Sequence, residues 1–194
     1  MSTLIQQKKS KVDNLLSALF LSFLWVNQAS AHLMVAQTGT LNIVGGDAFM
    51  ALSIPVSALK NVDQDDDQQV SLYEFNSRRN EIITQIQTAI GLETKGSPAV
   101  LHDLRLVPVR PHSGASVYMS QLIVLGRFEL ADGMKALNFR MSLFGRNPEE
   151  SSMKVTAKHP RSGQESVVLL TPAAPSSALF ASVVAQQDQT SSRP

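Results

Sequence analysis

Alternating apolar and polar positions predict that most of the chain beyond residue 32 forms β-strands. Residues 40–44 and 48–54 alternate in this way, and the intervening Gly45, Gly46 and Asp47 predict a β-hairpin. A short strand is expected over residues 33–37. After residue 100, further strands are expected at 104–109, 117–130, 135–144, 153–158 and 165–170, with turns at Asp132-Gly133 and at residues 161–163. This spacing favours an α+β fold whose β-rich body is antiparallel and sandwich-like.

Two helices are expected to interrupt the β pattern. Ser53 can cap a short helix that holds Pro55 in its first turn and runs to about Val62. A longer helix is expected over residues 72–90, where apolar side chains recur at steps of three and four and Gly91 follows as a stop signal. The two helices flank an acidic segment.

The acidic segment, residues 63–74, reads Asp-Gln-Asp-Asp-Asp-Gln-Gln-Val-Ser-Leu-Tyr-Glu. Carboxylates recur at alternate positions, an apolar Val70 follows, and a glutamate begins the next helix. In this register residues 58–83 resemble an EF-hand, a helix–loop–helix unit that binds calcium. The resemblance implies a Ca²⁺ site whose oxygen ligands come from Asp63, Asp65, Asp67, the Gln69 carbonyl, Ser71 and Glu74. We therefore expect an EF-hand-like segment, residues 55–90, inserted after the hairpin.

Two features of the segment depart from the EF-hand pattern. Gln68 stands where an EF-hand has glycine. A left-handed backbone there would cost about 1 kcal/mol or somewhat more, and since about 1.4 kcal/mol corresponds to tenfold, affinity could fall by about tenfold. EF-hands also resemble one another in working as pairs, whereas the sequence holds no second such loop. Val70 is therefore expected to pack against the β-rich part of the chain, against a second copy in a homodimer, or against another protein partner.

The N-terminus has the three-part layout of a secretory signal peptide. Lys8, Lys9 and Lys11 precede an apolar run at residues 15–26, and small residues end at Ala31. We expect cleavage after Ala31, a periplasmic or secreted protein, one domain over residues 32–185 and a disordered tail at 186–194. The alternatives are an uncleaved membrane anchor or a buried helix, although the run is short for crossing a bilayer and no later stretch is long enough.

Composition restricts the possible functions further. The chain has 194 residues, 43% of them hydrophobic, which suits a single domain with a substantial core. Its formal net charge is +1, and removing residues 1–31 takes away three lysines and Asp13 and leaves −1. No partnership with nucleic acid is therefore expected. The absence of cysteine excludes disulfides, thiolate metal sites and cysteine nucleophiles.

Other functions have weaker signals in the sequence. No common nucleophile, zinc-protease, P-loop or dinucleotide motif occurs, so no enzyme is expected. Cleavage after Ala31 would expose His32, whose amine and imidazole could bind copper, as in copper-dependent polysaccharide oxygenases, which it resembles in this one residue. A second histidine would have to be His102, His112 or His159. A third alternative is an envelope interaction module whose loop is only an acidic solvated turn.

Overall fold

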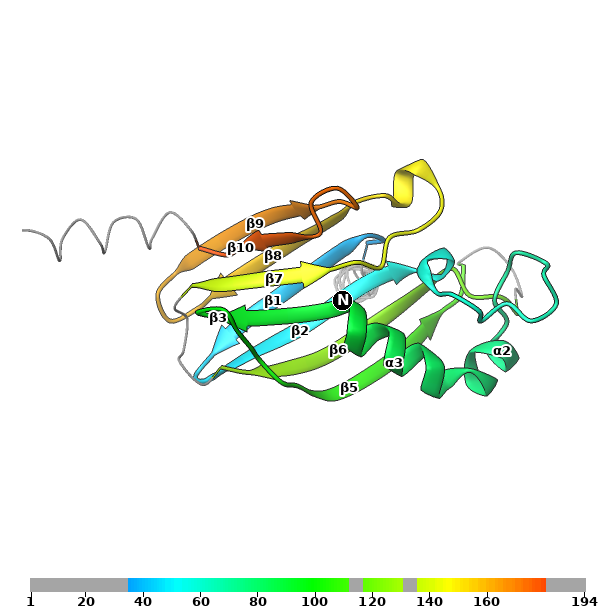
Figure 1. Cartoon of the computed structure of the whole chain (residues 1–194), viewed down its shortest axis with the longest axis horizontal. Helices are drawn as coiled ribbons and strands as arrows, with labels where there is room; N and C mark the ends of the chain where they lie inside the picture. Colours follow the sequence, from blue (N-terminus) through cyan, green and yellow to red (C-terminus); the bar gives the residue numbers. More distant parts are fainter. Residues whose placement is uncertain (1–34, 112–116, 131–135, 181–194) are drawn as a thin grey trace, which may run out of the picture. The chain divides into compact units, whose positions relative to one another are not determined.

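The computed structural model describes residues 35–111, 117–130 and 136–180, which form a β-rich body of two sheets with two α-helices (Figure 1). The predicted signal peptide, its cleavage point, His32, the Asp132-Gly133 turn and the predicted tail lie outside the described residues. Within those ranges, no helix has the length and apolar character needed to cross a membrane.

The larger sheet has six strands in the order β5-β6-β2-β1-β8-β9, and the smaller has four in the order β10-β7-β3-β4. The strands are β1 (Thr38–Val44), β2 (Asp47–Pro55), β3 (Ile90–Thr94), β4 (Ser97–Pro98), β5 (Leu101–Val109), β6 (Gln121–Glu129), β7 (Leu137–Met141), β8 (Met153–His159), β9 (Gln164–Leu170) and β10 (Ser176–Ala178). The helices are α2 (Leu72–Ser77) and α3 (Arg79–Ala89), with short 3-10 helices η1 (Val56–Ala58) and η2 (Pro148–Glu150).

The predicted N-terminal hairpin is confirmed. Val44 of β1 pairs with Asp47 of β2 around a two-residue turn, in which Gly45 adopts a left-handed φ of 64°. The strands expected after residue 100 correspond to β5 to β9, and the turn at residues 161–163 joins β8 to β9. No strand forms at residues 35–37, where the chain turns and Gln37 has a φ of 52°.

The body is not antiparallel throughout. Strands β1 and β8 run parallel, with Thr40 opposite Thr156, whereas the other strand pairs of the two sheets are antiparallel. The purely antiparallel expectation is therefore wrong at this pair. A tight turn fixes the relative direction of two consecutive strands, but β1 and β8 are far apart in sequence and only tertiary packing sets their direction.

One hydrophobic core joins the two sheets and the helices. Figure 1 shows β3 and β7 in front of β1 and β2, and the buried side chains of both sheets belong to a single cluster. In β2, the alternate side chains Ala48, Met50, Leu52 and Ile54 are 0–3% exposed, as the alternation in the sequence predicts. The core also receives Ile82 and Ile86 from α3 and Phe75 from α2.

The segment before the acidic loop is not the predicted helix. Strand β2 continues to Pro55, which pairs with Gln121 of β6, and only the three-residue η1 follows. Pairing with β6 keeps residues 53–55 in the strand, so the expected helix cannot begin at Ser53. The predicted EF-hand-like helix–loop–helix therefore has an α-helix only after the loop.

The predicted helix over residues 72–90 is present but divided. It breaks at Arg78, where φ is −104° and ψ is 14°, and it ends at Ala89, so that Gly91 lies in β3. At the break the Ser77 hydroxyl donates a hydrogen bond back to the Glu74 carbonyl (2.9 Å), an arrangement that bends helices. Arg79, within the apolar stripe, keeps its guanidinium 5.3 Å from the centre of the Phe75 ring.

Candidate metal site

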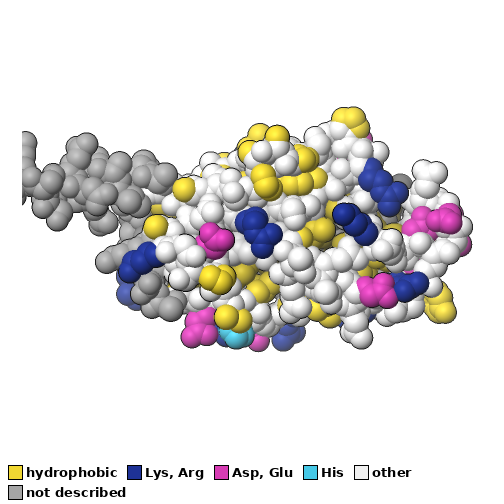
Figure 2. Space-filling model, viewed as in Figure 1, with side chains coloured by type: hydrophobic (Ala, Val, Ile, Leu, Met, Phe, Trp, Pro, Cys, Tyr) yellow, Lys and Arg dark blue, Asp and Glu magenta, His cyan; other side chains and the backbone are white. Residues whose placement is uncertain are grey.

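The acidic loop, residues 63–70, projects between two buried anchors. Val62 is 1% exposed and Val70 is 7% exposed, so both ends of the loop are fixed in the core while residues 64–69 lie at the surface. Figure 2 shows acidic side chains gathered at the end of the body where this loop lies. The chain thus holds several negative charges together on a short, firmly attached turn.

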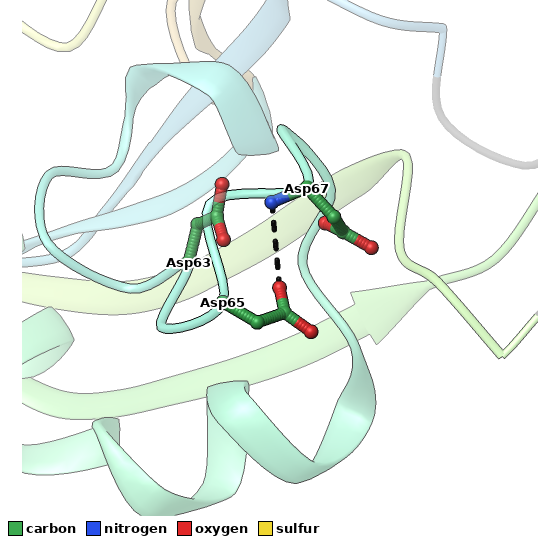
Figure 3. A group of neighbouring side chains, drawn as sticks. All are labelled: Asp63, Asp65 and Asp67. Atoms are coloured by element: carbon green, nitrogen blue, oxygen red, sulfur yellow. Dashed lines mark hydrogen bonds between the residues drawn. The ribbon is translucent and has the colours of Figure 1, made fainter.

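Three of the predicted ligands form a cluster in the loop. One carboxylate oxygen from each of Asp63, Asp65 and Asp67 lies within 4.8 Å of the other two (Figure 3). Backbone amides orient them: Gln68 N–H donates to Asp63 Oδ2 (2.9 Å), Asp67 N–H to Asp65 Oδ1 (3.4 Å) and Gln69 N–H to Asp67 Oδ1 (2.8 Å). The turn therefore directs the three carboxylates toward one another despite their mutual repulsion.

One oxygen of this cluster is buried without a partner. Asp63 Oδ1 has no hydrogen bond among the described residues, although the other oxygen of the same carboxylate accepts from Gln68. A buried, unpaired carboxylate oxygen is costly unless a cation or a donor reaches it. A bound cation would satisfy it, and the hard oxygen donors around it suit Ca²⁺ or Mg²⁺ better than a soft metal.

The backbone of the loop is strained where the sequence predicts it. Gln68 has a φ of 65°, which confirms the expected left-handed conformation at the position where an EF-hand carries glycine. Asp66 is also left-handed, with a φ of 60°. Such conformations cost a side-chain-bearing residue roughly 1–2 kcal/mol, although aspartate tolerates them better than most.

Ser71 and Glu74, which are also predicted ligands, are hydrogen-bonded to each other. They form a capping box at the start of α2: the Ser71 hydroxyl accepts from the Glu74 N–H (3.2 Å), and Glu74 Oε2 accepts from the Ser71 N–H (2.8 Å). Glu74 Oε1 accepts from the Gln64 N–H (2.7 Å). The Ser-x-x-Glu spacing is a known helix-start signal that the sequence analysis did not use. Glu74 lies outside the aspartate cluster.

The hydrogen bonds around Glu74 change its acidity. Backbone donors from Gln64 and Ser71 lower the pKa of Glu74 below its ordinary value of 4.5, although burial opposes them. Asp65 shows the opposite effect. Partial desolvation, with the charges of Asp67 and Glu74, raises the pKa of Asp65 above 3.8. The loop thus combines a firmly ionised glutamate with an aspartate that binds protons more readily than usual.

Val70 pairs with another part of the same chain. The Met119 N–H donates to the Val70 carbonyl (2.8 Å), and Ser71 forms an antiparallel bridge with Tyr118. Met119 is itself buried, at 6% exposure. Of the packing partners considered for Val70, contact with the β-rich part of the chain is confirmed.

Tyr118 is a site residue that sequence reasoning missed. A hydrogen bond with the Asp67 carboxylate, and the charge of that carboxylate, raise the pKa of the Tyr118 phenol. Nothing in the spacing of the sequence signals this contact, because residue 118 reaches the loop only through the pairing of residues 117–119 with residues 70–72.

Of the histidines considered for copper, the two that the structure describes lie far apart. His32 and His112 lie outside the described residues. His102 is near Glu129 (Nε2–Oε2, 3.5 Å) and His159 bonds Ser162 (Nδ1–Oγ, 2.6 Å). His102 is on β5 and His159 is on β8, with β6, β2 and β1 between them. Since neighbouring strands lie about 4.8 Å apart, the two strands are about 19 Å from each other. These two histidines cannot share one ion.

The sequence matches no protein-family model. It also matches no curated protein sequence. The chemistry of the acidic loop is therefore the main indication of function.

Proposed function

We propose that this protein binds one calcium ion in the acidic loop. The observation that supports this most directly is the cluster of Asp63, Asp65 and Asp67, in which the buried Asp63 Oδ1 has no partner among the described residues. These residues would hold the ion together with the Gln69 carbonyl. Calcium takes six to eight oxygen ligands in flexible geometry, which suits a surface turn with spare positions for water.

The proposal gives Glu74 and Ser71 a supporting role. Their polar groups are already engaged in the capping box and in the bond to Gln64, so they hold the loop closed beneath the ion. If calcium also drew Glu74 into its coordination, those hydrogen bonds would have to be exchanged for the ion. We propose that Ser71 and Glu74 keep these hydrogen bonds when calcium binds, and that water or another ligand completes the coordination of the ion.

An EF-hand origin of the loop remains part of the proposal. It is supported by the register of residues 63–74, by the left-handed Gln68 and by the inward Val70 that meets a short extended segment. The 3-10 helix in place of an incoming α-helix is a difference from the EF-hand pattern. The resemblance therefore concerns the loop and the helix after it.

We propose a structural rather than a signalling role for the ion. The loop lies between residues anchored in the core, and residues 70–72 pair with residues 117–119, so a large opening of the helices would disrupt packed contacts. A site of about 10⁻⁴–10⁻³ M affinity would be occupied outside the cytoplasm, which the predicted signal peptide makes the expected location. The intact mass of the protein recovered from the producing cell would test cleavage after Ala31.

Calorimetric titration with CaCl₂ tests calcium binding directly. We expect heat of binding, and thermal stabilisation of about 1.4 kcal/mol when free calcium is tenfold above the dissociation constant. Asp65→Asn should weaken binding at least tenfold. Asp66→Asn is the matched control, since it removes the same charge from the same loop at a residue outside the cluster, and it should weaken binding only slightly.

Two results would contradict the proposal. The first is the absence of both heat and thermal stabilisation at several millimolar calcium. The second is equal weakening by Asp65→Asn and Asp66→Asn, because that would indicate diffuse attraction of cations to an acidic surface. Titration with MgCl₂ separates the two hard cations: the flexible loop should favour calcium, since magnesium requires near-octahedral geometry and gives up its water reluctantly.

A further inference from the structure

A cavity of about 380 Å³ lies beside the acidic loop. It is bounded by η1 and Leu59, by Asp63 and residues 68–70, by residues 119–120 just before β6, and by Arg146, Asn147 and Glu150 around η2. Its volume is within the range of small-molecule sites, about 300–1,000 Å³, toward the lower end. It therefore suits a ligand no larger than a single sugar ring or a small organic acid.

The cavity has an apolar floor and a polar rim. The floor is formed by four side chains that are 3–7% exposed: Val56, Leu59, Val70 and Met119. The rim is formed by polar residues from four separate segments: Ser57, the loop residues Asp63, Gln68 and Gln69, Ser120, and the group Arg146, Asn147 and Glu150. Polar residues outnumber apolar ones in this lining, so the cavity suits a small ligand that itself carries charged or hydroxyl groups and one apolar face.

The wall formed by η2 is fixed in place by specific contacts. Glu150 Oε2 accepts a hydrogen bond from the Ser57 hydroxyl (2.5 Å), and the Gly145 N–H donates to the Glu150 carbonyl (3.0 Å). A Cβ at Gly145 would lie only 2.4 Å from Glu150 Cβ. The two sides of the cavity, far apart in sequence, are thus held in a defined position.

Two groups on the rim lack partners. The Arg146 side chain is exposed and forms no hydrogen bond or ion pair with any described residue, although its backbone N–H reaches Ser57 (3.3 Å). Asp63, which carries the buried unpaired Oδ1, lines the same cavity. Glu150 is already bonded to Ser57, so Arg146 is the rim cation available to a ligand.

The proposed calcium ion would have unfilled coordination positions at this cavity. Asp63, Asp65, Asp67 and the Gln69 carbonyl supply fewer ligands than the six to eight oxygens that calcium takes, because Ser71 and Glu74 are engaged elsewhere. Asp63 and Gln69 both line the cavity. An oxygen anion in the cavity could complete the coordination and pair with the planar Arg146 guanidinium.

We infer that the cavity binds a small carboxylate ligand, whose carboxylate is shared between the bound calcium ion and Arg146 and whose apolar face rests on the floor. A hexuronic acid has this chemistry: one carboxylate, a ring with an apolar face, and hydroxyls for the polar rim. The inference depends on the proposed calcium site, since without the ion the three aspartates would repel the carboxylate.

Titration of the calcium-saturated protein with D-galacturonate tests the inference, with D-galactose as the probe that lacks the carboxylate. We expect galacturonate to bind at least tenfold more tightly than galactose, and at least tenfold more tightly with calcium than with EGTA. Arg146→Gln should weaken galacturonate binding at least tenfold while calcium affinity stays within about twofold. Arg105→Gln removes the same charge from an exposed position on β5, and it should change neither galacturonate binding nor calcium affinity.

Terbium luminescence provides an independent readout. Tb³⁺ in place of calcium reports the water molecules bound to it through its decay rate in H₂O and D₂O, and both galacturonate and acetate should reduce that number. If neither anion displaces water and galacturonate binds no better than galactose, the inference is overturned while the calcium site stands. If no ion binds at all, both proposals are overturned.

Discussion

The carboxylate of Glu74 accepts a hydrogen bond from the backbone N–H of Gln64 at 2.7 Å, which joins the first turn of α2 to the beginning of the acidic loop. The same carboxylate also receives the N–H and hydroxyl of Ser71. One buried side chain therefore joins both ends of the loop through hydrogen bonds of the protein itself.

Glu74→Gln should destabilise the protein even without calcium. The amide keeps an oxygen acceptor but loses the charge that strengthens bonds to buried N–H groups, so we expect the free energy of unfolding in EGTA to fall by about 1–3 kcal/mol. Urea unfolding of both proteins in EGTA measures this difference in the free energy of unfolding. Unchanged stability in EGTA with a large loss of calcium affinity would instead make Glu74 a direct ligand.

The contribution of Glu74 should depend on pH in a defined direction. Because its folded-state pKa is lowered, ionised Glu74 stabilises the fold above its ordinary value of 4.5, and that stabilisation is lost as pH falls through the folded-state value. In EGTA, the difference in unfolding free energy between the natural protein and Glu74→Gln should be constant from pH 7 to about pH 5. It should then shrink at lower pH. A difference that grew on acidification would contradict this assignment.

Gln68→Gly should strengthen calcium binding. Glycine adopts the left-handed conformation at this position without the cost of a side chain, which should recover about 1 kcal/mol and tighten binding by up to tenfold. Gln69→Gly is the matched control, because Gln69 is in the same loop without a positive φ and would only gain freedom in the unfolded chain. Calorimetric titration with calcium should show tighter binding for Gln68→Gly and little change for Gln69→Gly. Equal changes in calcium affinity for the two variants would show that backbone strain at residue 68 does not weaken calcium binding.

Gly145→Ala should disturb the wall of the cavity. The added methyl group would overlap Glu150 and Ser57, and forcing them apart should cost about 1–3 kcal/mol of stability. Gly46→Ala is the control, since the nearest atom to its Cβ would be 3.9 Å away and its φ is not positive. Thermal unfolding compares the two. Equal melting temperatures would show that residues 145–150 can move apart to accept the added methyl group at little cost in stability.

Local patterns in the sequence determined much of the fold. The hairpin at Gly45-Gly46 follows from a turn signal between two alternating runs, and five later strands follow from alternation, because both signals act between neighbours in the chain. The left-handed backbone at Gln68 likewise follows from loop register. The segment at residues 55–62 has plausible helix signals, yet it follows a strand that pairs on both sides, and long-range pairing outweighs a weak local preference.

The acidic loop shows the same division between sequence and structure. The order of residues alone predicts that Asp63, Asp65 and Asp67 fall on one turn, because a short loop brings alternate positions together. Three other relationships arise only in the folded chain: Glu74 closes the loop, Val70 pairs with Met119, and Arg146 shares a cavity with Asp63. Those contacts join distant segments, and the packing of the whole core, rather than any local pattern, brings these segments together.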